Sequence, residues 1–149
     1  MPIVTISNNY PNFQLLSPTV RAILQMVAAG EDRTFEKVSL IVSDDNTLNR
    51  LKKHYFDDDV LTDTISFNFN EIDQSIDGEI YISIDRIREN AEQFNTGFRR
   101  ELALVIIHSF LHLIGYEDSL PTDKQQMDRI QQQYLSQIPL KRLYRNLNN

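Results

Sequence analysis

The sequence contains no cysteine and few glycines and prolines, four and five among 149 residues. Without cysteine there are no disulfide bonds and no thiolate ligands, so any metal ion must be held by histidine and carboxylate side chains. No Gly/Ser-rich linker, repeat or low-complexity tract divides the chain. A single domain over residues 1–149 is therefore predicted, since this length suits one compact core.

Long apolar runs and basic residues are also missing from the first ten residues, "MPIVTISNNY". Neither a secretory signal nor a membrane-spanning helix can be inferred there, and a cytoplasmic location without membrane contact is the expectation. Positive charge is in short supply as well, because 15 Lys and Arg face 21 Asp and Glu. A net charge of -6 disfavours non-specific attraction to nucleic acid or anionic lipid, and the scattered arginines are expected to lie on solvated helix faces.

Alternation and helical periodicity predict the order βαβαββααα. The predicted strands are 3–9, 37–44, 63–69 and 78–84, and the predicted helices are 18–29, 44–56, 85–95, 98–114 and 121–136. This order is typical of an α+β fold with a small mixed β-sheet covered by helices. The last two strands could pair as a hairpin or flank another strand, and residues from about 139 form a candidate flexible tail.

Capping residues support several of these boundaries. Ser17 and Pro18 are expected as N-cap and first residue of one helix, which should stop at Gly30. Asp44 or Asp45 is the expected cap of the next helix, and Asp85 that of the helix 85–95.

The stretch "ELALVIIHSFLHLIGYED" places His108 and His112 four positions apart in a helix that is apolar on nearly every side. Such a helix should be central and buried. Side chains at i and i+4 leave the same face, so the two imidazoles can converge on one ion. Gly115 should end the helix and turn the chain back, which would bring Asp118 to the same point.

The pattern His-x-x-x-His-x-x-Gly-x-x-Asp has the spacing of the metzincin zinc motif, His-Glu-x-x-His-x-x-Gly-x-x-His. Aspartate in the last position keeps a good zinc ligand and leaves three protein ligands with an open position, as in a catalytic site. Ser109 occupies the position of the protease glutamate, and a serine cannot take a proton from metal-bound water near neutral pH. Peptide hydrolysis by that route is therefore not expected.

Less specific interpretations remain open for these residues. The two histidines could simply pack in the core with Asp118 as a capping residue, and Glu117 could replace Asp118 as third ligand. The third histidine, His54, lies in a polar helix and is expected at the surface. Nickel, cobalt or iron would also accept two imidazoles and a carboxylate.

In "HSFLHLIGYED" the sequence resembles the YbeY family of bacterial rRNA maturation factors, whose signature is His-Gly-x-Leu-His-Leu-x-Gly-Tyr-Asp-His. Two further blocks, "LTDTISF" (61–67) and "GEIYISID" (78–85), are similar to that family's Pro-Thr-Asp-Val-Leu-Ser-Phe and Gly-Asp-Ile-x-Ile-Ser. The resemblance spans about residues 36 to 130. It departs from the signature at Ser109, Glu117 and Asp118.

The resemblance implies a metal-dependent, single-strand-directed endoribonuclease that trims the 3′ end of 16S rRNA and acts with the 30S ribosomal subunit in assembly and quality control. The family usually has an arginine where this sequence has Phe56, followed by "DDD". An arginine there could clamp a phosphate, whereas Phe56 removes that clamp and could instead stack on an unpaired base or serve as a core or surface aromatic.

These considerations give a specific hypothesis for the site. His108, His112 and Asp118 would hold one Zn²⁺ and a water, and Asp63 could serve as general base if its strand lines the cleft. Thr62 and Ser66 would either line a substrate groove or make turn and strand-edge hydrogen bonds. Arg99, with its neighbour Arg100, is the nearest sequence candidate for a phosphate contact.

Three classes of function follow. The first is a zinc-dependent endoribonuclease in rRNA processing. The second is a non-catalytic ribosome assembly factor with a structural metal, which the acidic charge, Ser109 and the missing arginine would favour. The third is a metzincin-type peptidase, which the missing glutamate makes the weakest of the three.

Overall fold

The structure is a computed structural model that describes residues 2–71 and 73–147. The elements are β1 (Ile3–Asn8), β2 (Phe13–Leu15), α1 (Ser17–Gly30), β3 (Phe35–Ser43), α2 (Asp45–Phe56), β4 (Thr64–Asn68), β5 (Ile76–Ser83), α3 (Ile84–Phe94), α4 (Phe98–Ile114), α5 (Pro121–Leu135) and β6 (Tyr144–Asn146). The predicted α+β class is confirmed, and the sequence-based boundaries agree to within about two residues for most elements. The short strands β2 and β6 were not predicted.

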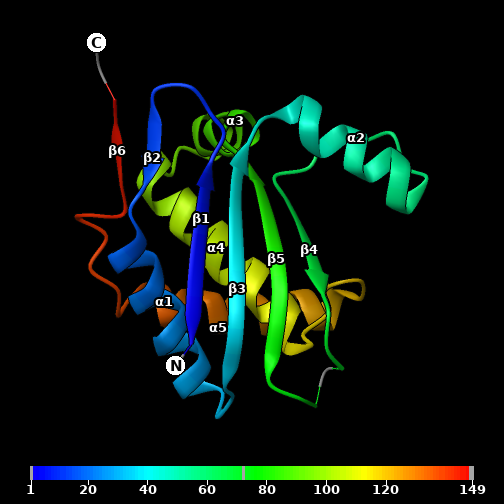
Figure 1. The fold of residues 1–149 in the computed structure, drawn as a ribbon, viewed down its shortest axis with the longest axis vertical. Coiled ribbons are helices and arrows are strands. Elements are labelled where there is room, and N and C mark those ends of the chain that lie inside the picture. Colours follow the sequence, from blue (N-terminus) through cyan, green and yellow to red (C-terminus); the bar gives the residue numbers. More distant parts are fainter. Residues whose placement is uncertain (1, 72, 148–149) are drawn as a thin grey trace.

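The main sheet has four strands in the order β1-β3-β5-β4. β1, β3 and β5 run parallel, whereas β4 pairs antiparallel with β5, so the last two predicted strands form the hairpin. Val38, Leu40 and Val42 alternate along β3 and are fully buried. Figure 1 shows α4 and α5 behind the sheet, where they cover one of its faces. β4 lies at one edge of the sheet.

Helix α4 is the centre of the core, as predicted from its apolar circumference. Leu102, Ile106 and Phe110 have no exposed surface, and the helix packs against β4 and β5 and against α1, α3 and α5. Glycines flank it at 97 and 115, both with positive φ. In the described part of the chain, no helix combines the length and apolar character that crossing a membrane requires.

The helix caps differ in part from the expectation. Asp44 caps α2 as predicted, since its carboxylate accepts a hydrogen bond from the Thr47 N–H. Helix α1 begins at Ser17 itself, and its N-cap, Leu16, makes no side-chain hydrogen bond.

The predicted cap of α3, Asp85, is also wrong. Its carboxylate accepts from the Tyr10 hydroxyl at 2.5 Å and from the Asp45 N–H at 3.1 Å. Ser83 caps α3 in its place, through a hydrogen bond from the Arg86 N–H.

The C-terminal segment, whose residues from about 139 are the candidate flexible tail, is hydrogen-bonded to the rest of the chain as far as Leu147. β6 pairs antiparallel with β2, and Leu143 is fully buried. Arg99 donates to the carbonyls of Leu140 and Lys141. Residues 148–149 of the expected tail lie outside the described residues.

Candidate metal centre

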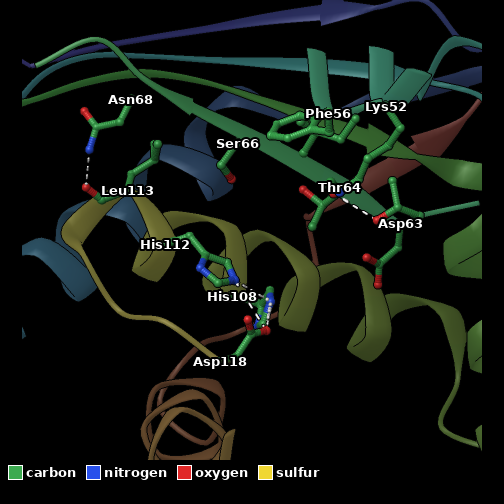
Figure 2. Close-up of a pocket in the computed structure, with 12 residues that line it drawn as sticks. Lys52, Phe56, Asp63, Thr64, Ser66, Asn68, His108, His112, Leu113 and Asp118 are labelled. Carbon is green, nitrogen blue, oxygen red and sulfur yellow. Dashed lines mark hydrogen bonds and ion pairs between the residues drawn. The ribbon is translucent and has the colours of Figure 1, made fainter. Parts of the chain in front are cut away.

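His108 and His112 project from α4 into a pocket between that helix and the edge strand β4 (Figure 2). The pocket has a volume of about 480 Å³ and opens to solvent. Its lining residues are Lys52, Phe56, Thr62, Asp63, Thr64, Ile65, Ser66, Asn68, His108, His112, Leu113 and Asp118. Residues of α2, β4, α4 and the loop after α4 therefore meet around one cavity.

The side chains of His108, His112 and Asp118 form a compact cluster in this pocket. The two Nε2 atoms lie 3.0 Å apart, and Asp118 Oδ2 lies 3.4 Å from His108 Nε2 and 3.6 Å from His112 Nε2. From these separations, the point equidistant from the three atoms is about 1.9 Å from each. Zinc bonds to imidazole nitrogen and carboxylate oxygen are about 2.0 to 2.2 Å, so the three atoms fit one such ion.

The other ring nitrogen of each histidine has its own acceptor. His108 Nδ1 is bonded to the side-chain oxygen of Gln131 on α5, and His112 Nδ1 lies 3.0 Å from the Tyr116 carbonyl oxygen. Because both partners can only accept, the proton of each neutral ring is on Nδ1. Both Nε2 lone pairs then face the same point, which is unfavourable between two nitrogens alone and suits a shared cation.

The environment favours the neutral form of His112. Burial lowers its pKa, and the neighbouring charge of His108 lowers it further, although Asp118 opposes these effects. An imidazole must be deprotonated at the coordinating nitrogen to bind a metal ion. The burial that lowers the pKa of His112 thus favours the ligand form at neutral pH.

A tight turn after α4 carries Asp118 to the histidines. Gly115 has a φ of +123°, and its N–H donates to the carbonyls of Leu111 and His112. A side chain at this φ would be strained, so the turn requires glycine. Asp118 follows three residues later, and its side chain remains 40% exposed.

The same turn is held from the other side by Glu31, at the end of α1. Its carboxylate accepts hydrogen bonds from the hydroxyls of Tyr116 in the turn and Tyr134 on α5. The hydrogen bond to Glu31 is the main reason that the pKa of Tyr116 rises to about 12. Glu31 therefore ties α1, the turn and α5 together beside the cluster.

Ser109 faces β4 and not the cluster. It is fully buried, and its hydroxyl lies 2.6 Å from the Val105 carbonyl oxygen and 2.7 Å from the Thr64 hydroxyl. Ser66 donates to the Ser109 carbonyl and Asn68 to the Leu113 carbonyl, so alternate side chains of β4 are attached to α4. These contacts fix the edge strand against the helix that carries the histidines.

The other residues expected at the site fall into two groups. Asp63, Thr62 and Ser66 line the pocket, although the Thr62 hydroxyl donates to the Thr64 carbonyl and Ser66 is engaged with α4. Arg99 does not line the pocket, because its guanidinium lies over Tyr144 and binds the C-terminal segment. The expected phosphate contact from Arg99 therefore has no support in the structure.

The remaining candidates lie outside the cluster. Arg100 donates to the Gln132 side chain, and Glu117 is exposed. The prediction that His54 lies at the surface is confirmed.

Asp63 is a half-buried residue with a second acid nearby. Burial raises its pKa, whereas the charge of His108 and backbone hydrogen bonds lower it. Burial also raises the pKa of Glu101, which is 8% exposed, and the charge of Asp63 raises it further. Both acids line a smaller cavity of about 110 Å³ together with His108 and Gln131.

Several residues of the site were not identified from the sequence. Gln131 lies on α5, Lys52 on α2 and Glu31 directly after α1, and none of the three belongs to a recognisable spacing with the histidine motif. Tyr116 binds the His112 ring through its backbone carbonyl, which a residue of any type would provide. A sequence pattern could not have marked that contact.

Comparisons with known proteins agree with the geometry. A family model described as Endoribonuclease YbeY matches residues 5–139. The Endoribonuclease YbeY of Salinibacter ruber is 32% identical over 143 residues, which cover 91% of each chain. That of Chlorobium luteolum is 40% identical over 124 residues, which cover 83% of this chain and 87% of the relative.

A solved structure is similar as well. The solution structure of TM1509 from Thermotoga maritima matches with a TM-score of 0.63 and 26% identity, covering 89% of this chain and 87% of the other. The similarity thus reaches well beyond the three sequence blocks between residues 36 and 130.

Proposed function

This chain belongs to the Endoribonuclease YbeY family, and from that membership we propose that it is a zinc-dependent endoribonuclease that cuts single-stranded RNA. Its role would be maturation of the 3′ end of 16S rRNA, with the 30S subunit as partner in assembly and quality control, in the cytoplasm. The observation that carries the proposal is the convergence of two Nε2 atoms and a carboxylate oxygen within a pocket.

In this proposal His108, His112 and Asp118 hold one Zn²⁺. When bound, the ion would supply Lewis-acid chemistry, by polarising a phosphoryl oxygen and by lowering the pKa of a water molecule so that it gives up a proton near neutral pH and becomes nucleophilic. The three protein ligands leave room for water or substrate, as catalytic zinc sites do. Gln131 and the Tyr116 carbonyl keep the two rings in the coordinating tautomer.

Asp63 is the proposed general base. It lines the pocket, and burial moves its pKa upward, toward the range in which a carboxylate takes up a proton effectively near neutral pH. Thr62 and Ser66 shape the wall along which the RNA would lie. Ser66 also holds β4 on α4, so its contribution to binding is partly indirect.

A non-catalytic assembly factor with a structural metal is the second candidate. It is favoured by Phe56 at the position of the family arginine and by the three exposed carboxylates that follow it. A peptidase has less support, since Ser109 is buried against β4 and offers no base to the cluster.

The test combines metal content with RNA cleavage in four proteins: wild type, His112→Ala, Asp63→Asn and His54→Ala. His54 is an exposed histidine outside the cluster and serves as the matched control. Elemental mass spectrometry of untagged protein should find about one zinc per chain in wild type, Asp63→Asn and His54→Ala. His112→Ala should lose both the ion and the cleavage of single-stranded RNA. Asp63→Asn should keep the ion but lose most of the cleavage.

Unaltered RNA cleavage by His112→Ala would refute the metal mechanism. Zinc binding and 30S association without any cleavage by wild type would favour the assembly factor. Hydrolysis of casein that EDTA abolishes would revive the peptidase.

A further inference from the structure

A cluster of four aromatic rings borders the metal pocket on the side of α2. Tyr55 and Phe56 end that helix, Phe67 lies on β4 and Tyr81 on β5. The ring centroids of Phe67 are 5.3 Å from Tyr55, 6.0 Å from Phe56 and 5.9 Å from Tyr81. We call these residues the aromatic cluster.

Phe56 is the member that enters the pocket lining. Its ring is nearly parallel to that of Phe67, with 24° between the planes, yet 49% of the residue is exposed. Figure 2 shows Phe56 and Lys52 on the side of the pocket opposite His108, His112 and Asp118. A large aromatic surface is thus held in place by its neighbours and left open beside the candidate metal centre.

Lys52 completes this part of the pocket. Its ammonium lies 4.7 Å from the centroid of the Phe56 ring, and among the described lining residues it is the single lysine or arginine. An exposed cation–π contact is weaker than the stacking of a nucleobase on an aromatic ring. A base can therefore displace the flexible ammonium from the ring, and the freed charge can pair with the adjoining phosphate.

We propose that Phe56 and Lys52 form a subsite for one unpaired nucleotide of RNA, with the base on the Phe56 ring and its phosphate on Lys52. The inference rests on the proposed function and adds the part of the substrate that the subsite binds. Both faces of a base inside a duplex are covered by its neighbours, so only an unpaired base can use the ring. The subsite accordingly selects single strands by stacking.

The surrounding charges determine on which side of the Phe56 ring a phosphate can lie. Asp57, Asp58 and Asp59 are exposed directly after Phe56, and Asp59 is paired with Lys53 at 3.6 Å. Carboxylates on that side repel a phosphate backbone, which leaves the side of Lys52 and the metal cluster for it. An apolar protein partner would use the aromatic rings but not this neighbouring lysine or the metal pocket, so RNA is the favoured occupant.

The experiment measures binding apart from cleavage. Short labelled single-stranded and duplex RNAs are titrated by fluorescence anisotropy in EDTA, with wild type, Phe56→Leu, Lys52→Gln and Phe94→Leu. Phe94, with 62% exposure at the end of α3, does not line the pocket and is the matched control. Circular dichroism melting verifies that each variant is folded.

A second variant provides a direct probe of stacking. The chain has no tryptophan, so Phe56→Trp introduces a single indole at the subsite. A base stacked on it should quench its fluorescence as single-stranded RNA is added. Phe94→Trp should show no such quenching.

Phe56→Leu should bind single-stranded RNA about fivefold or more weakly than wild type, with duplex binding unchanged and Phe94→Leu like wild type. For Lys52→Gln the negative slope of log affinity against log salt concentration should become shallower by about 0.7, as for one lost phosphate contact. Equal single-strand affinity of wild type and folded Phe56→Leu would overturn the subsite even if wild type cleaves RNA. Unchanged RNA affinity with weaker 30S association would overturn it in favour of a protein contact.

Failure of the proposed function has a different signature. In that case wild type cleaves no RNA with zinc present. The fluorescence quenching in Phe56→Trp and the weaker binding of single-stranded RNA by Phe56→Leu would still be seen in EDTA, and would support the subsite. Absence of any RNA binding by wild type would overturn both.

Discussion

Replacing Gln131 by leucine tests how strongly the acceptor behind His108 controls metal binding. Gln131 is 7% exposed, and its side-chain oxygen is the partner of His108 Nδ1. Leucine has a similar volume but no acceptor. The Nδ1 proton is then left without a partner, and the ring shifts toward the tautomer that has its proton on Nε2. In that tautomer Nε2 cannot coordinate the ion.

Two independent considerations give the size of the effect. Loss of a partner that orients a ligand costs about 10- to 100-fold in metal affinity, or about 1.4 to 2.7 kcal/mol. A buried donor without an acceptor costs about 1 to 3 kcal/mol. Because His112 keeps its bond to the Tyr116 carbonyl, only one of the two rings is affected, and we expect zinc affinity to fall about 30-fold.

The assay is a zinc competition titration against a chromophoric chelator at neutral pH. Gln132→Leu is the control, since Gln132 is the next residue of α5 and its side chain bonds Arg100 instead. Gln131→Glu should bind zinc at least as tightly as wild type, because a carboxylate is a stronger acceptor. Wild-type affinity in Gln131→Leu would show that this contact does not set the tautomer.

Two further predictions concern stability. Burial raises the pKa of Glu101, so the native state holds its proton more tightly than the unfolded chain and loses stability as pH rises above the usual carboxyl range near about 4.3. Glu101→Gln should therefore raise the melting temperature at neutral pH but not at pH about 4, and an equal gain at both would argue against this linkage. Leu143→Ala, in the docked C-terminal segment, should lower the free energy of unfolding by about 2 to 5 kcal/mol. Leu147→Ala, at a residue 44% exposed, should change it by less than about 0.5 kcal/mol in the same urea titration, and similar small losses in both would mean that the segment is not packed as described.

The sequence predicted best where the signal is local. The bounds of α4 were found because glycines precede and follow an apolar helix. The convergence of His108 and His112 follows from helical geometry alone, and Gly115 made the return of Asp118 foreseeable.

Contacts between distant segments could not be predicted in the same way. β2 is three residues long, and its partner β6 lies about 130 residues later, so neither has a pattern of its own. Asp85 looked like a cap, but a tyrosine 75 positions away and the start of α2 use its carboxylate. Arg99 was the nearest candidate in the sequence for a phosphate contact, whereas the fold directs it to the C-terminal segment.

Helix α5 carries two polar side chains, three residues apart, that bind different parts of the molecule. Gln131 reaches the histidine pair, and Tyr134 reaches Glu31 at the end of α1. Metal occupancy and the docking of α5 are therefore thermodynamically reciprocal, since an ion that binds more tightly to the oriented His108 also holds the helix that orients it. If His108 binds zinc as proposed, zinc availability would set how firmly α5 is held on the core, and hydrogen exchange of α5 amides would report the occupancy of the candidate metal centre on α4.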